Sequence, residues 1–215
     1  GSNAGHVRIY DWNGTAWTQL GADIDGEAAD DRSGYSVSMN AAGDRVAIGA
    51  YGNDGNGISG AGSGHVRIYD WNGTAWLQLG NDIDGEGGGD ASGHSVSMNA
   101  AGDRLAIGAW SNDGNGSSAG HVRIYDWNGT AWTQLGADID GESAGDESGY
   151  SVSMNAAGDR LAIGARTNDG NGSSAGHVRI FNWNGTTWTQ VGNDIDGEAA
   201  SDFCGSSVSM NAAGD

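Results

Sequence analysis

"GHVRIYDWNGTAWTQLGADIDGE" occupies residues 5–27 and returns almost unchanged at residues 64–86, 120–142 and 176–198. The histidine in its second position recurs at spacings of 59, 56 and 56 residues. A period somewhat above the roughly 40–50 residues of a four-stranded propeller blade indicates one repeat array. Residues 1–215 are therefore expected to form a single array with units 5–63, 64–119, 120–175 and 176–215, the last being incomplete. Residues 1–4 match a cloning remnant and equally the "SSAG" before a later repeat.

Four strand-like runs occur in each full unit, at 35–40, 44–50, 65–71 and 75–80 in the first. Apolar residues alternate with small or polar ones along these runs, which is the period of a β-strand. The Asn-Gly of "WNGT" and the glycine of "NAAGD" predict tight hairpins between the runs, because both positions tolerate positive φ. No segment has helical periodicity, so the sequence predicts an all-β fold of four-stranded antiparallel sheets.

The first two runs have one bulky face and one small face. The bulky face carries Val37, Met39, Val46 and Ile48, and the small face carries Ser36, Ser38, Ala47 and Gly49. Neither face is charged, so both are expected to be covered, large side against small side, by a neighbouring copy. This stacking predicts a β-propeller. The repeated tryptophans are expected to pack between blades, with sugar stacking as the alternative.

The charge of the chain limits its partners. Nine basic residues face 28 acidic ones, which gives a formal net charge of −19. Such a charge disfavours nucleic acid and anionic lipid surfaces as partners. No apolar run reaches the length that spans a membrane, so no membrane insertion is expected. Cys204 is the single cysteine and cannot form an intramolecular disulfide.

Antiparallel strand order places all the long acidic connections at one end of the blades. The "DIDGE" carboxylates there predict a calcium site, because Ca²⁺ takes six to eight oxygen ligands. These residues are Asp23, Asp25, Glu27, Asp82, Asp84, Glu86, Asp138, Asp140, Glu142, Asp194, Asp196 and Glu198. The "NDGNG" segments add candidate ligand-binding residues Asn53, Asp54, Asn56, Asn112, Asp113, Asn115, Asn168, Asp169 and Asn171. The alternative is that these residues only form turns.

The sequence offers no distinct catalytic set. Each repeat has one histidine at the entry of its third strand, and equivalent histidines on separate blades lie too far apart to share an ion. A structural role is therefore expected for them. The chain is predicted not to be an enzyme, because its carboxylates and histidines recur in nearly identical copies rather than in one asymmetric site.

The ordered motifs resemble the FG-GAP repeat of integrin α-type β-propellers. Its first signature corresponds to Ser33-Gly34 and its copies, its second to Gly49-Ala50 and its copies without proline, and its third to "GHVRIY". The calcium-binding loop of that family is absent at its usual place, where this chain has only "NAAGD". The resemblance extends to tandem-repeat surface proteins of bacteria and implies an extracellular or cell-surface location.

These observations together predict a non-enzymatic propeller module that presents acidic loops for adhesion, ligand binding or Ca²⁺ binding. A glycan-binding lectin and a spacer without a ligand are the alternatives. The partner would be a protein or a glycan. The chain holds four copies of most strands but three of the second, so either the natural protein continues or another chain fills the gap. A homodimer that completes a larger ring is a further expectation, with a ring of four units and an open superhelix of stacked sheets as the alternatives.

Overall fold

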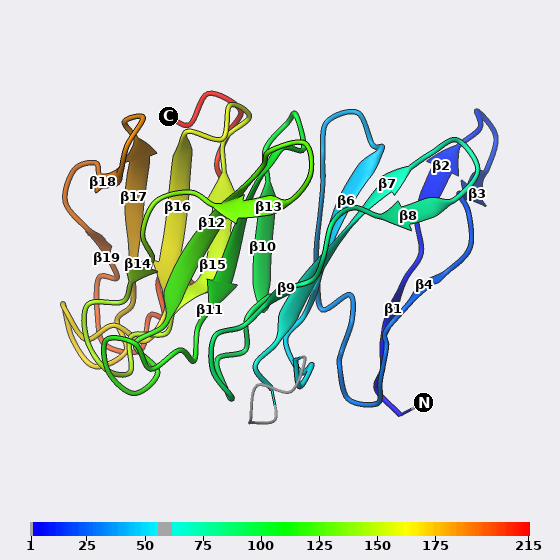
Figure 1. The fold of residues 1–215 in the computed structure, drawn as a ribbon. Coiled ribbons are helices and arrows are strands. Elements are labelled where there is room, and N and C mark those ends of the chain that lie inside the picture. Colours follow the sequence, from blue (N-terminus) through cyan, green and yellow to red (C-terminus); the bar gives the residue numbers. More distant parts are fainter. Residues whose placement is uncertain (1, 56–61) are drawn as a thin grey trace.

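The computed structural model describes residues 2–55 and 62–215 and contains strands but no helix in that part of the chain (Figure 1). The first complete blade is an antiparallel sheet in the order β5-β6-β7-β8. Its strands are β5 (Ser36–Met39), β6 (Arg45–Ala50), β7 (His65–Trp71) and β8 (Trp76–Gln78). A short strand, β9 (Ile83–Asp84), pairs with the start of β7.

Two further blades repeat this topology. The second contains β10 (Ser95–Met98), β11 (Arg104–Ala109), β12 (His121–Trp127), β13 (Trp132–Gln134) and β14 (Ile139–Asp140). The third contains β15 (Ser148–Met154), β16 (Arg160–Ala165), β17 (His177–Trp183), β18 (Trp188–Gln190) and β19 (Ile195–Asp196). The predicted fold class, an all-β propeller of four-stranded antiparallel blades, is confirmed.

Partial blades flank the three complete ones. At the N-terminal side, β1 (His6–Val7) pairs with β4 (Ile24–Asp25), and β2 (Tyr10–Trp12) pairs with β3 (Trp17–Gln19). β1 and β2 correspond to the third strand of a complete blade, β3 to the fourth strand and β4 to the short strand β9. At the C-terminal side, the segment 206–215 lies beside the third blade, where the backbone N–H of Met210 donates to Ser153 Oγ at 2.9 Å.

The predicted hairpins form for the expected reasons. In the turn after β7, Gly73 has a φ of 96° and the Asn72 side chain accepts hydrogen bonds from the backbone of Thr74 and Ala75, both at 2.9 Å. In the turn after β5, Gly43 has a φ of 74°. An asparagine oxygen therefore closes the first turn while a glycine supplies the left-handed backbone in each of them.

The strand bounds agree with the prediction except in the acidic segment. The run expected at 75–80 is shorter, Trp76–Gln78, and β9 was not predicted. Ile83, between two aspartates, is buried in the core, and Ile83 and Asp84 pair with Val66 and His65 at the start of β7. Part of "DIDGE" is therefore strand rather than loop.

The hydrophobic core lies between blades rather than inside one sheet. Bulky side chains on the second blade, Val96, Met98, Leu105 and Ile107, pack against the first blade. The first blade contributes Ala47, Val66, Ile68 and Ile83 to the same cluster. The predicted packing of a bulky face against a smaller one is thus confirmed. The two blades also lie close together, because Ser36 Oγ donates to the Gly93 carbonyl of the next blade at 2.7 Å.

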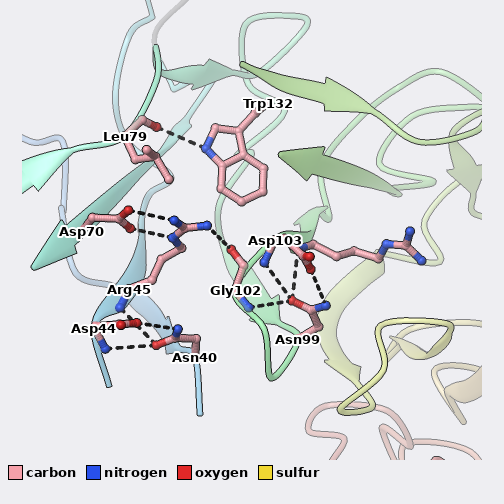
Figure 2. A network of polar contacts seen from close by, with 10 residues as sticks. Asn40, Asp44, Arg45, Asp70, Leu79, Asn99, Gly102, Asp103 and Trp132 are labelled. Atoms are coloured by element: carbon pink, nitrogen blue, oxygen red, sulfur yellow. Dashed lines mark hydrogen bonds and ion pairs between the residues drawn. The ribbon is translucent and has the colours of Figure 1, made fainter. Parts of the chain in front are cut away.

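Polar contacts also join the blades at the hairpin end (Figure 2). Arg45 forms two bonds to the Asp70 carboxylate, at 2.5 and 2.7 Å, and donates to the Gly102 carbonyl of the second blade at 2.9 Å. The Trp132 indole donates back to the Leu79 carbonyl of the first blade at 3.1 Å. The predicted role of these tryptophans between blades is confirmed.

The long connections gather at the other end of the blades, at the lower edge of Figure 1, as strand order predicted. Within the described residues there is no helix that is both long and apolar enough to cross a membrane.

Candidate metal centres between the blades

Three groups of one histidine and two carboxylates recur at the interfaces between blades. They are Glu27–His65–Asp82, Glu86–His121–Asp138 and Glu142–His177–Asp194. In each group, one potential ligand atom from every residue lies within 4.8 Å of the others. We call them clusters 1, 2 and 3.

The position of each histidine follows from strand pairing. His65 begins β7, after Gly64 with a φ of 74°, and pairs with Asp84 of β9. Its side chain is 98 % buried, since its relative exposure is 2 %. His121 and His177 occupy the same position in β12 and β17 and are as deeply buried.

The two carboxylates of a cluster come from different blades. Asp82 lies in the turn between β8 and β9, where Gln78 donates to its Oδ1 at 2.5 Å and its Oδ2 lies 3.7 Å from His65 Nδ1. Glu27 follows β4 of the preceding partial blade, and its Oε2 lies 4.0 Å from the same nitrogen. The cluster exists only because two successive copies stack.

A buried arginine adjoins each cluster. Arg67 donates to the Asp25 carbonyl at 2.8 Å, and its Nη1 lies 3.5 Å from Glu27 Oε1. Burial lowers the pKa of His65, and Arg67 lowers it further, whereas Asp82 and Glu27 act in the opposite direction. Burial and Arg123 likewise lower the pKa of His121. These imidazoles are therefore neutral at neutral pH, the form that binds a metal.

Cluster 3 borders a pocket of about 500 Å³. Its lining includes Glu142 and Asp194 of the cluster together with Asp146, Asp169 and Asp196. So many carboxylates make the pocket suited to a cation and unfavourable for an anionic ligand.

The predicted "DIDGE" residues do not act as one set. The first aspartate of a copy joins the cluster of its own blade (Asp82, Asp138, Asp194), and the glutamate joins the cluster of the next blade (Glu27, Glu86, Glu142). The middle residues Asp25, Asp84, Asp140 and Asp196 lie in the short strands that pair with the histidines. Asp23 and Glu198, from the two end copies, join no such group among the described residues.

The predicted "NDGNG" residues hold their own loops together. Asp113 and Asp169 accept backbone N–H groups of Ser118 and Ser174, both at 2.7 Å. The remaining side chains bond within these loops or to the neighbouring acidic segment: Asn53, Asp54, Asn112, Asn115, Asn168 and Asn171. Asn56 lies outside the described residues. This pattern favours the turn-forming interpretation.

Sequence reasoning missed the histidines as candidate metal ligands. It compared each histidine with the other histidines, whereas the partners are carboxylates from the same and the preceding copy. Strand pairing places the histidine beside Asp84 of its own blade, whereas Glu27 reaches it only through the stacking of two copies.

The fold and these clusters define an all-β propeller with repeated histidine–carboxylate groups between its blades. No family model and no curated protein matches the chain. Among solved structures, it is similar to a putative 6-phosphogluconolactonase from Bacteroides fragilis NCTC 9343, with 12 % sequence identity and a TM-score of 0.57. The match covers 91 % of this chain and 49 % of that chain, so this chain spans about half the length of its structural neighbour. At this identity the likeness shows the fold alone.

Three predictions need correction in the light of these comparisons. The resemblance to the FG-GAP family is contradicted, because no family model matches and the similar structure carries a different name. The predicted non-enzymatic adhesion module and the predicted absence of enzyme activity are contradicted as well, because that structure is named for an enzyme. Repetition of a site was a weak argument against catalysis, because each copy of a motif can form a site of its own beside a pocket, as clusters 1 and 3 do.

Proposed function

We propose that the protein binds divalent transition-metal ions, with Zn²⁺ as the best match, at clusters 1 to 3. The observation that carries this proposal is the convergence of a buried imidazole nitrogen with carboxylates from two blades. One imidazole and two carboxylates are ligands that zinc accepts, with an open position left for water. Calcium, which takes oxygen ligands, fits the same set poorly.

The distances within the clusters support metal binding over a purely internal network. The histidine Nδ1 atoms lie 3.7, 3.9 and 3.7 Å from the aspartates of their own blades. These separations exceed those of hydrogen bonds. Ligand atoms around a tetrahedral zinc ion lie roughly 3.4 Å apart, given bonds of about 2.0–2.2 Å. Small side-chain movements would therefore bring the three groups onto one ion.

A second candidate function is hydrolysis of an ester or lactone at the pocket beside cluster 3. The enzyme name of the structural neighbour and the pocket favour it. A divalent ion held by three protein ligands supplies Lewis-acid activation of water. Water would add to the carbonyl carbon and the C–O bond would break, giving a carboxylic acid and an alcohol. The acidic lining favours a neutral or cationic substrate over a phosphorylated one.

Calorimetric titration of metal-free protein with ZnCl₂, MnCl₂ and CaCl₂ tests metal binding. We expect zinc to bind, and Glu142→Gln to lower the zinc stoichiometry by one ion per chain. Asp11→Asn, which removes one exposed charge outside the clusters, is the matched control and should leave the stoichiometry unchanged. Absence of zinc binding, or equal binding by both variants, contradicts the proposal. Calcium binding with the same stoichiometry in the wild-type protein and in Glu142→Gln would indicate a site of oxygen ligands elsewhere.

Hydrolysis needs its own assay. Release of acid from a neutral sugar lactone and from its phosphorylated counterpart would be followed with and without zinc. We expect zinc-dependent hydrolysis of the neutral lactone that Glu142→Gln abolishes and Asp11→Asn retains. Rates equal to the uncatalysed background would remove the hydrolase candidate and leave metal binding to be judged by calorimetry.

A further inference from the structure

Contacts between neighbouring blades repeat residue for residue along the chain. A tryptophan indole donates to a carbonyl of the preceding blade in the pairs Trp76–Leu20, Trp132–Leu79 and Trp188–Leu135. An arginine donates in the same direction in the pairs Arg67–Asp25, Arg123–Asp84 and Arg179–Asp140. Each blade therefore has a leading face, which carries the donors and points toward the preceding blade. Its trailing face carries the acceptors and points toward the next blade.

The leading face of the N-terminal partial blade has no neighbouring blade among residues 2–55 and 62–215. Its members are Tyr10, Trp12 and Trp17, and Arg8 stands at the position of Arg67. Tyr10 is 45 % exposed, whereas its counterpart Tyr69 is 8 % exposed. Trp17, the counterpart of Trp76, is 67 % exposed. These aromatic rings are the exposed versions of side chains that pack between blades elsewhere.

The trailing face of the third blade exposes apolar side chains that are more deeply buried in the other complete blades. It comprises Val178, Ile180, Val191 and Ile195, and the first, second and fourth of these line an apolar pocket of about 370 Å³. Ile195 is 55 % exposed, whereas its counterpart Ile83 is 6 % exposed. A Cβ on Gly192 would meet no atom within 4 Å, whereas a Cβ on its counterpart Gly80 would meet the ring of Trp127.

We propose that a second copy of this chain docks head to tail, its leading N-terminal face on the trailing face of the third blade. Each donor or aromatic ring exposed on the leading face matches an acceptor or apolar side chain exposed on the trailing face. Trp17 of one copy would donate to the Val191 carbonyl of the other, and Arg8 to the Asp196 carbonyl. Tyr10 would pack on Val178, Ile180 and Ile195, as Tyr69 packs with Val7, Ile9 and Ile24.

Two such contacts close a ring. The two faces differ, so the contact is heterologous. Heterologous contacts form a closed ring only when a whole number of copies completes one full turn. A ring of two copies requires each copy to span half of a full turn. At each junction, the segment 206–215 of one copy would take the first strand position of a blade, and β2 and β3 of the other copy the third and fourth. The strand between them, the counterpart of β6, is present in neither partial blade.

The dimer would also complete a fourth cluster, an extension that rests on the proposed metal binding. Glu198 follows β19 as Glu27 follows β4, and His6 and Asp23 stand at the positions of His65 and Asp82. Glu198 of one copy would thus meet His6 and Asp23 of the other. The partner contributes a ligand that the single chain cannot supply to this position.

Light scattering after size-exclusion chromatography tests the dimer without any metal. We expect a mass twice that of the 21.8 kDa chain. Trp17→Arg and Ile195→Arg should each give a monomer, whereas Leu77→Arg, an exposed apolar residue on β8 outside both faces, should remain dimeric. Circular dichroism would confirm that all three variants keep their strands.

Mixing the two monomeric variants tests the polarity of the contact. Trp17→Arg retains an intact trailing face and Ile195→Arg an intact leading face, so an equimolar mixture should regain dimers through one intact junction. A monomeric wild-type chain, or a mixture that stays monomeric, overturns the proposal. Zinc titration of the dimer gives an independent result for the fourth cluster: Glu198→Gln should lower the stoichiometry of the dimer while leaving its mass unchanged. A changed zinc stoichiometry without a dimer would contradict the shared site but not metal binding.

Discussion

A Cβ atom on Gly108 would overlap the carbonyl oxygen of Gly149, although the two glycines belong to different blades. The same carbonyl accepts a hydrogen bond from Ser95 Oγ at 2.8 Å. The backbones of adjacent blades therefore touch at this point, and the distance between blades is fixed by a residue without a side chain. The relationship recurs between Gly49 and Gly93 and between Gly164 and Gly205.

Gly108→Ala should destabilise the protein by about 1–3 kcal/mol, because overpacking forces rigid backbone apart. The urea midpoint, followed by tryptophan fluorescence, measures the change. Gly87→Ala is the control, because its Cβ would meet only the flexible Asp90 carboxylate, at 3.3 Å. Equal midpoints for the two variants would contradict the close approach of the blades.

Val96→Ala should cost roughly 1–2 kcal/mol, because the side chain is buried between the first and second blades. Val37→Ala, at the same position of the first blade, should change stability little, since Val37 is 53 % exposed where Val96 is 9 % exposed. Thermal and urea denaturation measure both. A similar loss for the two variants would show that the core does not lie between blades.

Arg104→Lys should lower stability by about 1–2 kcal/mol. Lysine cannot donate to both oxygens of Asp126 and to the Gly158 carbonyl at the same time, as arginine does. Arg104 lies 2.6 and 2.7 Å from the two oxygens of Asp126 and 3.0 Å from the Gly158 carbonyl of the next blade. Arg32→Lys, at an exposed site, is the control. Urea midpoints that fall equally for both would argue against a special role for the contact between blades.

Acid should weaken the protein through its buried histidines. The pKa of His65 is lowered in the folded state, so the unfolded chain takes up a proton first as the pH falls below about 6.5. The contribution to stability is complete above that unfolded pKa and is lost as the pH falls through the folded pKa. Asp82, Glu27 and Asp84 oppose the shift, and Arg67 adds to it.

Unfolding free energies measured between pH 8 and pH 4.5 check this expectation. His65→Gln should flatten the decline below pH 6.5 relative to the wild-type chain, because glutamine takes up no proton in this range. The comparison separates the histidine from the carboxylates, which titrate in both proteins. An unchanged slope in His65→Gln would contradict the assignment.

Much of the fold was predictable because it depends on short-range chemistry. The Asn72-Gly73 turn and Gly43 fix the hairpins locally, and the alternation of Val37 and Met39 with small residues fixes the two faces of the sheet. The histidine period fixed the number of copies. These features need only the backbone preferences and side-chain sizes of neighbouring residues.

The candidate sites were not predictable in this way. His65 and Asp82 are separated by 17 positions, and Glu27 comes from another copy, so only stacking brings their oxygens and nitrogen together. The function expected from motif resemblance was wrong for a related reason: recurring short motifs follow the blade, whereas the candidate sites lie between blades. The sequence by itself determined strands, turns and repeats, because these arise within one copy. The tertiary structure alone decided which buried histidine faces which carboxylates, because that depends on how closely two copies can approach.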